Sequence, residues 1–138
     1  MGVKLPANYR PSKDETFMNK RQLEYFRLKL LAWRTELLED YNETRSHLGK
    51  GERAGSDFAD MASAESDHAQ ELRTRDRERK LTSKIDQALE RIGNGTYGYC
   101  ADTGNPIGLA RLEARPVASL SIEAQERHEE EEIRGIRG

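Results

Sequence analysis

The sequence has little cysteine and no long apolar run, and each shortage excludes a class of protein. Its single cysteine, Cys100, cannot form a disulfide within the chain. No apolar stretch approaches the ~20 residues that a membrane-spanning helix needs. The first residues, MGVKLPANYRPSKDE, lack the apolar segment of a secretory signal peptide. We therefore expect a cytoplasmic protein without a membrane segment or a disulfide framework.

Apolar residues are scarce, and neither sign of charge is in large excess. Of the 138 residues, 35% are hydrophobic and another 35% are charged, a composition typical of long helices washed by solvent rather than of a thick globular core. The formal net charge of -2 argues against the strongly basic surface of a nucleic-acid-binding protein. We accordingly expect no sequence-specific DNA binding.

A helical periodicity is present in two stretches of the chain. Asn19 and Gln22 have the spacing of a capping box before the first stretch. Its apolar positions recur every three or four residues, at Leu23, Phe26, Leu30, Trp33, Leu37 and Tyr41. Residues 49–57, GKGERAGSD, interrupt the pattern. The second stretch has periodic positions at Phe58, Met61, His68, Leu72, Leu81, Ile85, Leu89 and Ile92, and a stop signal at Gly93-Asn94-Gly95.

These patterns predict a mainly α fold. Neither helix could bury its apolar stripe alone, so the two are expected to fold back on each other. The result is a long antiparallel two-helix coiled-coil hairpin with a small globular lobe and a C-terminal helix. The predicted divisions are a flexible N-terminal arm at 1–18, the hairpin at 19–93 with its tip near 49–62, a compact lobe at 94–121 and the C-terminal helix at 122–138. A hairpin that covers its own seam predicts a monomer.

A run of charge occupies residues 73–80, RTRDRERK. Two interpretations of it remain open. It is either a solvated helix face with ion pairs such as Glu71–Arg75 and Asp76–Lys80, or a patch for an acidic partner or a phosphate ligand. Elsewhere, no nucleophile–base set, phosphate-binding loop or metal cluster stands out in the sequence. We therefore predict that the protein is not an enzyme.

Four longer strings indicate a family. MNKRQLEYFRLKLLAW, ELRTRDRERKL, YGYC and RLEARP resemble the DksA/TraR family of RNA polymerase-binding transcription regulators. The resemblance runs from about Phe17 to Glu126. It implies that the hairpin enters the secondary channel of RNA polymerase and that the protein acts with guanosine tetraphosphate (ppGpp). It further implies altered stability of open promoter complexes, with inhibition of ribosomal RNA promoters and activation of biosynthetic ones.

The resemblance assigns polymerase contacts to the hairpin. The family motif Asp-x-x-Asp-x-Ala stands at Asp57, Asp60 and Ala62, where the glycine-rich break ends. Taken alone, Asp57 would be an ordinary helix N-cap and Asp60 an acid favoured by the helix dipole. Capping and contact can coexist on one turn. Arg77 also occupies a family position and is expected to face polymerase.

The ppGpp site implied by the resemblance combines hairpin and lobe. Leu81 and Lys84 would come from the second helix, and Arg115 from the RLEARP string. Lys and Arg are the usual donors to phosphate groups, although a single surface cation is more often plain surface charge. A third basic residue that the family has on the C-terminal helix is replaced here by Gln125, which can still donate a hydrogen bond.

The family folds its lobe around zinc, held by two Cys-x-x-Cys pairs. The four corresponding positions here are Cys100, Thr103, Ser121 and Ala124. Because structural zinc takes about four ligands and only one thiol remains, we predict no zinc, with the positions vestigial. The lobe is then a degenerate zinc-finger-like unit, held by a small apolar core. Candidates for that core are Tyr97, Tyr99, Ile107, Leu109, Leu112, Val117, Leu120 and Ile122.

Two other functions remain open at this point. Asp57 and Asp60, at i and i+3, could hold a catalytic Mg²⁺ in polymerase, as the acids of secondary-channel transcript-cleavage or anti-pausing factors do. A structural coiled-coil adaptor with no polymerase role would need only the hairpin. A transcript-cleavage assay separates the first alternative from the regulator, and a polymerase pull-down separates the second.

Overall fold

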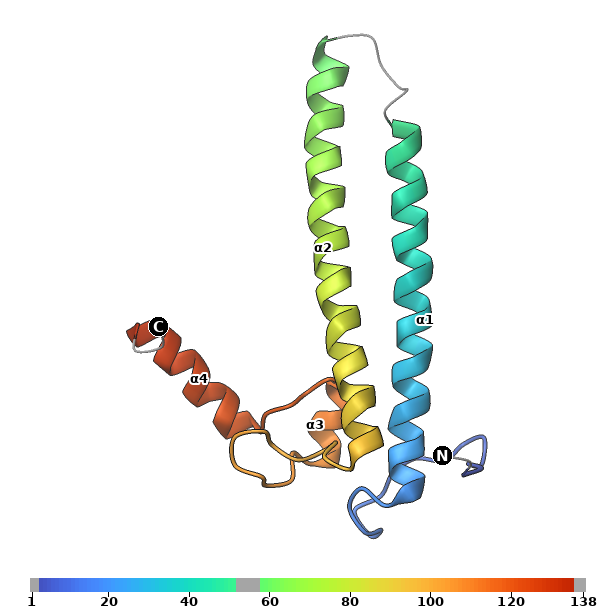
Figure 1. The fold of residues 1–138 in the computed structure, drawn as a ribbon, viewed down its shortest axis with the longest axis vertical. Coiled ribbons are helices and arrows are strands. Elements are labelled where there is room, and N and C mark those ends of the chain that lie inside the picture. Colours follow the sequence, from blue (N-terminus) through green and yellow to red (C-terminus); the bar gives the residue numbers. More distant parts are fainter. Residues whose placement is uncertain (1–2, 52–57, 136–138) are drawn as a thin grey trace. The chain divides into compact units, whose positions relative to one another are not determined.

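A computed structural model describes residues 3–51 and 58–135 of the chain, with side chains at 3–43 and 65–135 (Figure 1). The described residues form four α-helices: α1 (Lys20–Gly51), α2 (Phe58–Asn94), α3 (Leu109–Ala114) and α4 (Ile122–Arg134). They contain no strand, only an isolated bridge between Tyr99 and Pro106. None of these helices has the length and apolarity that a membrane crossing requires. The mainly α fold class is therefore confirmed.

The ends of the two long helices follow from local side-chain chemistry. The Asn19 carboxamide oxygen accepts the Gln22 amide at 2.9 Å, and the Gln22 side chain accepts the Met18 amide at 2.7 Å. The two amides would otherwise lack partners, as at any helix start. At the far end of α2, the amides of Thr96 and Tyr97 both donate to the Arg91 carbonyl oxygen. This closes the helix at the Gly-Asn-Gly stop that the sequence predicts.

The chain divides into two compact units, which we describe separately. The hairpin unit is Leu31–Ile85, and the lobe-bearing unit is Met1–Leu30 with Asp86–Gly138. The lobe-bearing unit therefore takes the first turns of α1 and the last turns of α2 together with the lobe. The division into four parts at residues 18, 93 and 121 remains a prediction about which segments fold independently.

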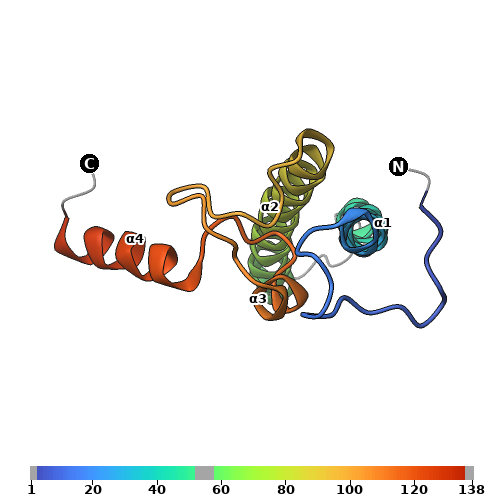
Figure 2. The same cartoon turned by 90° about the horizontal axis from the view of Figure 1, so that it is seen from below.

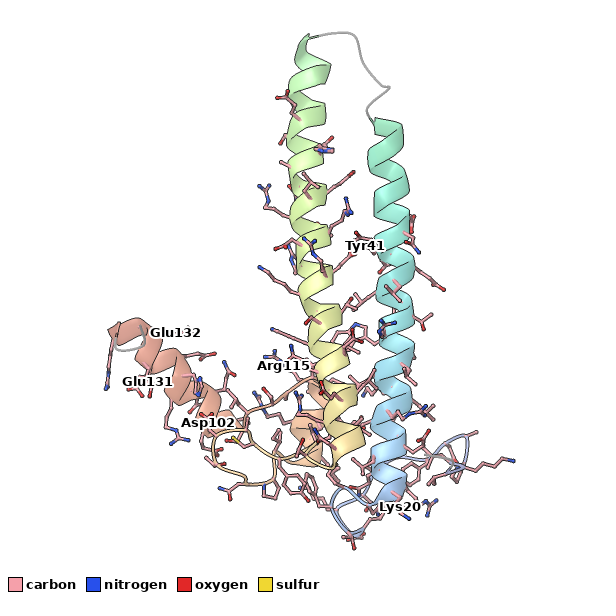
Figure 3. The ribbon with its side chains drawn as sticks, in the orientation of Figure 1. Lys20, Tyr41, Asp102, Arg115, Glu131 and Glu132 are labelled. Carbon is pink, nitrogen blue, oxygen red and sulfur yellow. The ribbon has the colours of Figure 1, made fainter. Side chains whose placement is uncertain are left out.

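Within the hairpin unit, α1 and α2 meet through a polar pair. The Arg75 guanidinium donates to the Tyr41 hydroxyl at 2.7 Å and lies 4.8 Å from the centre of its ring. Figure 3 shows Tyr41 on the side of α1 that faces α2. The apolar seam is thinner here than the periodicity predicts, because Leu37 is buried while Leu72 is 45% exposed. This stretch of hairpin is held by mixed polar and apolar contacts.

The lobe-bearing unit contains most of the buried apolar residues among those described. Phe26 and Leu30 of α1 are fully buried, and the Phe26 ring lies 5.7 Å from the ring of Tyr97. Tyr97 is itself fully buried and donates to the Pro116 carbonyl oxygen at 2.8 Å. The other buried apolar residues of this unit are Met18, Ala88, Ile92, Cys100, Leu112, Val117, Ala118 and Ala124. Figure 2 shows the loops of the lobe between the end of α2 and α4.

Residues 3–18 form part of this unit, where the sequence suggested a flexible arm. The Tyr9 ring contacts the Tyr25 ring edge-on, and the Phe17 ring contacts Tyr99 in the same way. Met18 is buried, with a left-handed backbone (φ 55°). Its side chain lies so close to Gly98 that a Cβ there would approach it to 2.7 Å. The segment is fixed by aromatic contacts to residues that are distant in sequence.

Paired leucines on α1 test where the core lies. Leu30 is fully buried whereas Leu28 is 48% exposed, two residues away on the same helix. We expect Leu30→Ala to lower the free energy of unfolding by about 2–5 kcal/mol, because it removes buried methyl groups and leaves a cavity. Leu28→Ala should cost well under half as much. Urea unfolding followed by circular dichroism measures both, and equal losses would contradict this assignment of the core.

Buried tyrosines make the stability of the lobe-bearing unit depend on pH in the alkaline range. Burial, and then the hydrogen bond and charge of Glu113, raises the pKa of Tyr25 to about 12. Burial likewise raises the pKa of Tyr97. Since a raised pKa favours the protonated hydroxyl in the folded state, this stabilisation is complete below the unfolded value of about 10 and is lost as the pH rises toward 12.

We therefore predict that the urea midpoint falls between pH ~9 and pH ~12, a window that runs from below the unfolded pKa of Tyr25 to its folded value. Tyr25→Phe removes one of the responsible groups, so its midpoint should fall less over the same interval. The comparison of slopes separates Tyr25 from the lysines, which titrate in both proteins. An identical fall in wild type and Tyr25→Phe would show that Tyr25 ionises normally.

Candidate functional site

The predicted tip lies largely outside what the structure describes. Asp57 is outside the described residues. Asp60 and Ala62 lie on the first turns of α2, but their side chains are also outside the described set. Their roles in polymerase contact therefore remain predictions.

Four cations share one exposed face of α2. They stand at positions i, i+4, i+7 and i+11, which return to the same side of an α-helix: Arg73, Arg77, Lys80 and Lys84. Beside them, Asp76 pairs with Arg79 and Lys80 at 3.1 Å each, and these hydrogen bonds hold the pKa of Asp76 below its usual value. The predicted Asp76–Lys80 pair is thus present. Such exposed pairs contribute little stability, so the face is available to a partner.

The four residues expected to bind ppGpp belong to the two units, two in each. Leu81 and Lys84 lie one turn apart on α2 in the hairpin unit, Leu81 half-buried and Lys84 exposed. Arg115 and Gln125 lie in the lobe-bearing unit. Arg115 is the exposed C-cap of α3 (Figure 3). Gln125 lies on the second turn of α4, where its side chain donates to Glu129 at 3.2 Å.

The expected metal positions gather around one sulfur atom. Burial raises the pKa of the Cys100 thiol, but hydrogen bonds with Thr103 and Ser121 outweigh it and lower the pKa to about 6. The Ser121 hydroxyl also caps α4 by accepting the Ala124 amide at 3.2 Å. The fold therefore brings Thr103 and Ser121 to Cys100, with Ala124 next to Ser121.

A contact that the sequence does not signal lies next to this cluster. The His128 ring of α4 hydrogen bonds to the Asp102 carboxylate, which follows Cys100 in the lobe (Figure 3). The two residues are 26 positions apart in the chain, so no local motif could have indicated the pair. Across the described residues, no group of three or more His, Cys, Asp or Glu side chains is placed to hold a metal ion.

Two family models match consecutive stretches of the chain. The model described as the N-terminal domain of the DnaK suppressor protein DksA matches residues 22–92. The model described as the prokaryotic dksA/traR C4-type zinc finger matches residues 95–130. Together they span most of the sequence.

Curated and solved proteins agree with these matches. The chain is 65% identical over 126 residues to the RNA polymerase-binding transcription factor DksA of Caulobacter vibrioides, which covers 91% of this chain and 89% of that protein. It is 40% identical over 117 residues to the factor of the same name from Escherichia coli K12, covering 85% and 78%. The solved structure of transcription factor DksA2 from Pseudomonas aeruginosa superposes with a TM-score of 0.78 at 47% identity, covering 84% of this chain and 89% of that one.

The zinc-finger match corrects one prediction. From the missing cysteines we predicted a protein without zinc, and the match of a C4-type zinc finger to residues 95–130 contradicts this by pointing to zinc binding. The donors do not make up the usual set, because the described residues around Cys100 offer one thiol with Thr103 and Ser121 hydroxyls, whereas structural zinc takes about four N or S ligands.

The motifs of the chain and its matched relatives indicate the same family. The matched models cover both the hairpin and the lobe, and a relative at 65% identity spans nearly the whole chain. A solved relative shares the fold. The chain belongs to the DksA family.

Proposed function

We propose that this protein regulates transcription by binding RNA polymerase. The observation that carries the proposal is its 65% identity, over 91% of the chain, to a protein named RNA polymerase-binding transcription factor DksA. In this proposal the hairpin enters the secondary channel of polymerase and alters the stability of open promoter complexes. Ribosomal RNA promoters are inhibited and biosynthetic promoters activated. The protein acts in the cytoplasm as a monomer and reads no DNA sequence itself.

The physical form of α1 and α2 suits this role. A helix of 37 residues, such as α2, extends about 55 Å at the ~1.5 Å rise of an α-helix, long enough to reach into a channel from outside. The exposed cations Arg73 and Arg77 suit an acidic surface at the channel entrance, where charge complementarity steers association. Asp57, Asp60 and Ala62 would then contact polymerase at the far end of the arm.

We further propose that ppGpp binds where Leu81, Lys84, Arg115 and Gln125 meet a surface of polymerase. Lys84 and Arg115 are both exposed, so their charges can reach phosphate oxygens. Leu81, half-buried and one turn before Lys84 on α2, offers an apolar contact to the ligand. Gln125 contributes a neutral donor, which bonds a phosphate more weakly than a cation does.

The relatives named above are transcription factors and not enzymes by name. The proposal accordingly assigns no catalytic residue to this chain. Cleavage of the transcript in backtracked complexes would replace it by the cleavage-factor alternative, and failure to bind polymerase would leave only the structural adaptor.

The tip acid can be tested without disturbing the rest of the hairpin. Asp60→Asn keeps the size of the side chain and removes its charge. We expect it to weaken inhibition of a ribosomal promoter about tenfold, the effect of ~1.4 kcal/mol lost at one contact. Polymerase binding should be largely retained, because other contacts supply most of the affinity. The control is Asp67→Asn, an exposed acid further along α2. Loss of binding in Asp60→Asn alone would contradict this division of roles.

The ppGpp residues predict a separate defect. Lys84→Ala and Arg115→Ala should each raise the half-saturating ppGpp concentration by about tenfold or more, since each removes a charge-assisted bond of ~1.5–3 kcal/mol. Inhibition without ppGpp should not change. Lys13→Ala, which removes an exposed lysine elsewhere, serves as the control. A ppGpp titration of in vitro transcription measures all three variants, and an unchanged response in both test variants would remove this site from the proposal.

A further inference from the structure

Lys29 of α1 forms two hydrogen bonds with Glu113 of α3. The Lys29 ammonium donates to the Glu113 backbone oxygen at 3.1 Å and to its carboxylate at 3.3 Å. One turn earlier on α1, burial and the same carboxylate raise the pKa of the Tyr25 hydroxyl. The Lys29 nitrogen also lies 5.8 Å from the centre of the Tyr25 ring. Lys29 and Glu113 are each about one-third exposed, so the cluster is partly shielded from water.

The backbone bond from Lys29 completes the end of α3. This helix has only six residues, Leu109–Ala114, and its last carbonyl oxygens lack partners within the helix. A cation at a helix C-terminus is favoured by those carbonyl dipoles. Lys29 supplies that cation from a different helix, at a sequence distance of 84 residues.

The chain just after Glu113 is fixed as well. The Arg115 amide donates to the Arg111 carbonyl oxygen at 2.7 Å, and its own carbonyl oxygen accepts the Ala118 amide at 3.0 Å. The next carbonyl, of Pro116, accepts the hydroxyl of the fully buried Tyr97. Arg115 therefore has a backbone secured on both sides and a side chain that is exposed.

A secured backbone lowers the entropic cost of using a long side chain. Ordering a rotamer-rich side chain at an interface costs conformational entropy, and a fixed backbone reduces how much of that side chain must be ordered. We propose that Lys29 is a positioning residue for Arg115. Through Glu113 it holds the end of α3, and so it increases affinity for a guanosine polyphosphate that it does not itself touch. This inference rests on the proposed role of Arg115 in binding ppGpp.

A double-mutant cycle tests the inference. Lys29→Met keeps an apolar stem of similar length and removes the ammonium group. We expect it to raise the half-saturating ppGpp concentration about two- to tenfold, the range that the ordering cost of one side chain gives. Inhibition of a ribosomal promoter without ppGpp should stay as in wild type. Lys29→Arg, which restores a donor, should recover most of the response. Lys20→Met, at an exposed lysine on the same helix, is the matched control and should behave as wild type.

The decisive variant combines Lys29→Met with Arg115→Ala. If Lys29 acts through Arg115, the double variant responds to ppGpp as Arg115→Ala does alone. A further loss in the double variant, or an unchanged response in Lys29→Met while Arg115→Ala is impaired, overturns the inference. If Arg115→Ala itself responds normally, the proposed ppGpp site is wrong and the inference falls with it. This outcome differs from one in which Arg115→Ala is impaired and Lys29→Met is not.

A second readout does not depend on polymerase. In Lys29→Met the amides of Arg115 and Ala118 should exchange with solvent faster, because the end of α3 loosens, while the core amide of Ile92 keeps its protection. Unchanged exchange at Arg115 and Ala118 would show that Lys29 does not hold this segment, and would overturn the inference.

Discussion

The hydrogen bond from the buried Tyr97 hydroxyl to the Pro116 carbonyl oxygen joins the start of the lobe to the segment after α3. The same tyrosine ring packs against Phe26 of α1, so a single fully buried side chain contacts both α1 and the lobe. Breaking this bond would leave a buried carbonyl without a partner, at a cost of ~1–3 kcal/mol. The position of Arg115 depends on it, because Arg115 lies directly before Pro116. The attachment of the lobe to the first turns of α1 depends on the same hydrogen bond.

The periodicity of the sequence predicted the helices and some of the residues that they bury. Phe26, Leu30 and Ile92 recur at helical spacing and are buried, as expected. Leu72 has the same spacing but is exposed, because periodicity gives the face of a helix and not how closely its partner approaches. The contacts of residues 3–18 were not predictable, since the Tyr9–Tyr25 and Phe17–Tyr99 ring pairs join segments without any local motif.

The residues of the candidate site could be predicted from the sequence, but the contacts that hold them in place could not. Positions such as Leu81 and Arg115 could be proposed because they stand in strings that resemble a known family. The contacts that hold Arg115, from Lys29 to Glu113 and from Tyr97 to Pro116, span 84 and 19 residues and have no sequence signature. The zinc prediction was wrong because counting thiols tests the ligands alone, whereas the family model matches the lobe as a whole. The structure adds that Cys100, Thr103 and Ser121 remain adjacent.

The central claim is that this member of the DksA family acts on polymerase at promoters. The most direct measurement is the lifetime of open complexes formed by purified RNA polymerase on a ribosomal promoter, with and without the protein. The account predicts a shorter lifetime when the protein is added, and a still shorter one with ppGpp present. A lifetime that is unchanged at protein concentrations that saturate binding to polymerase would contradict it.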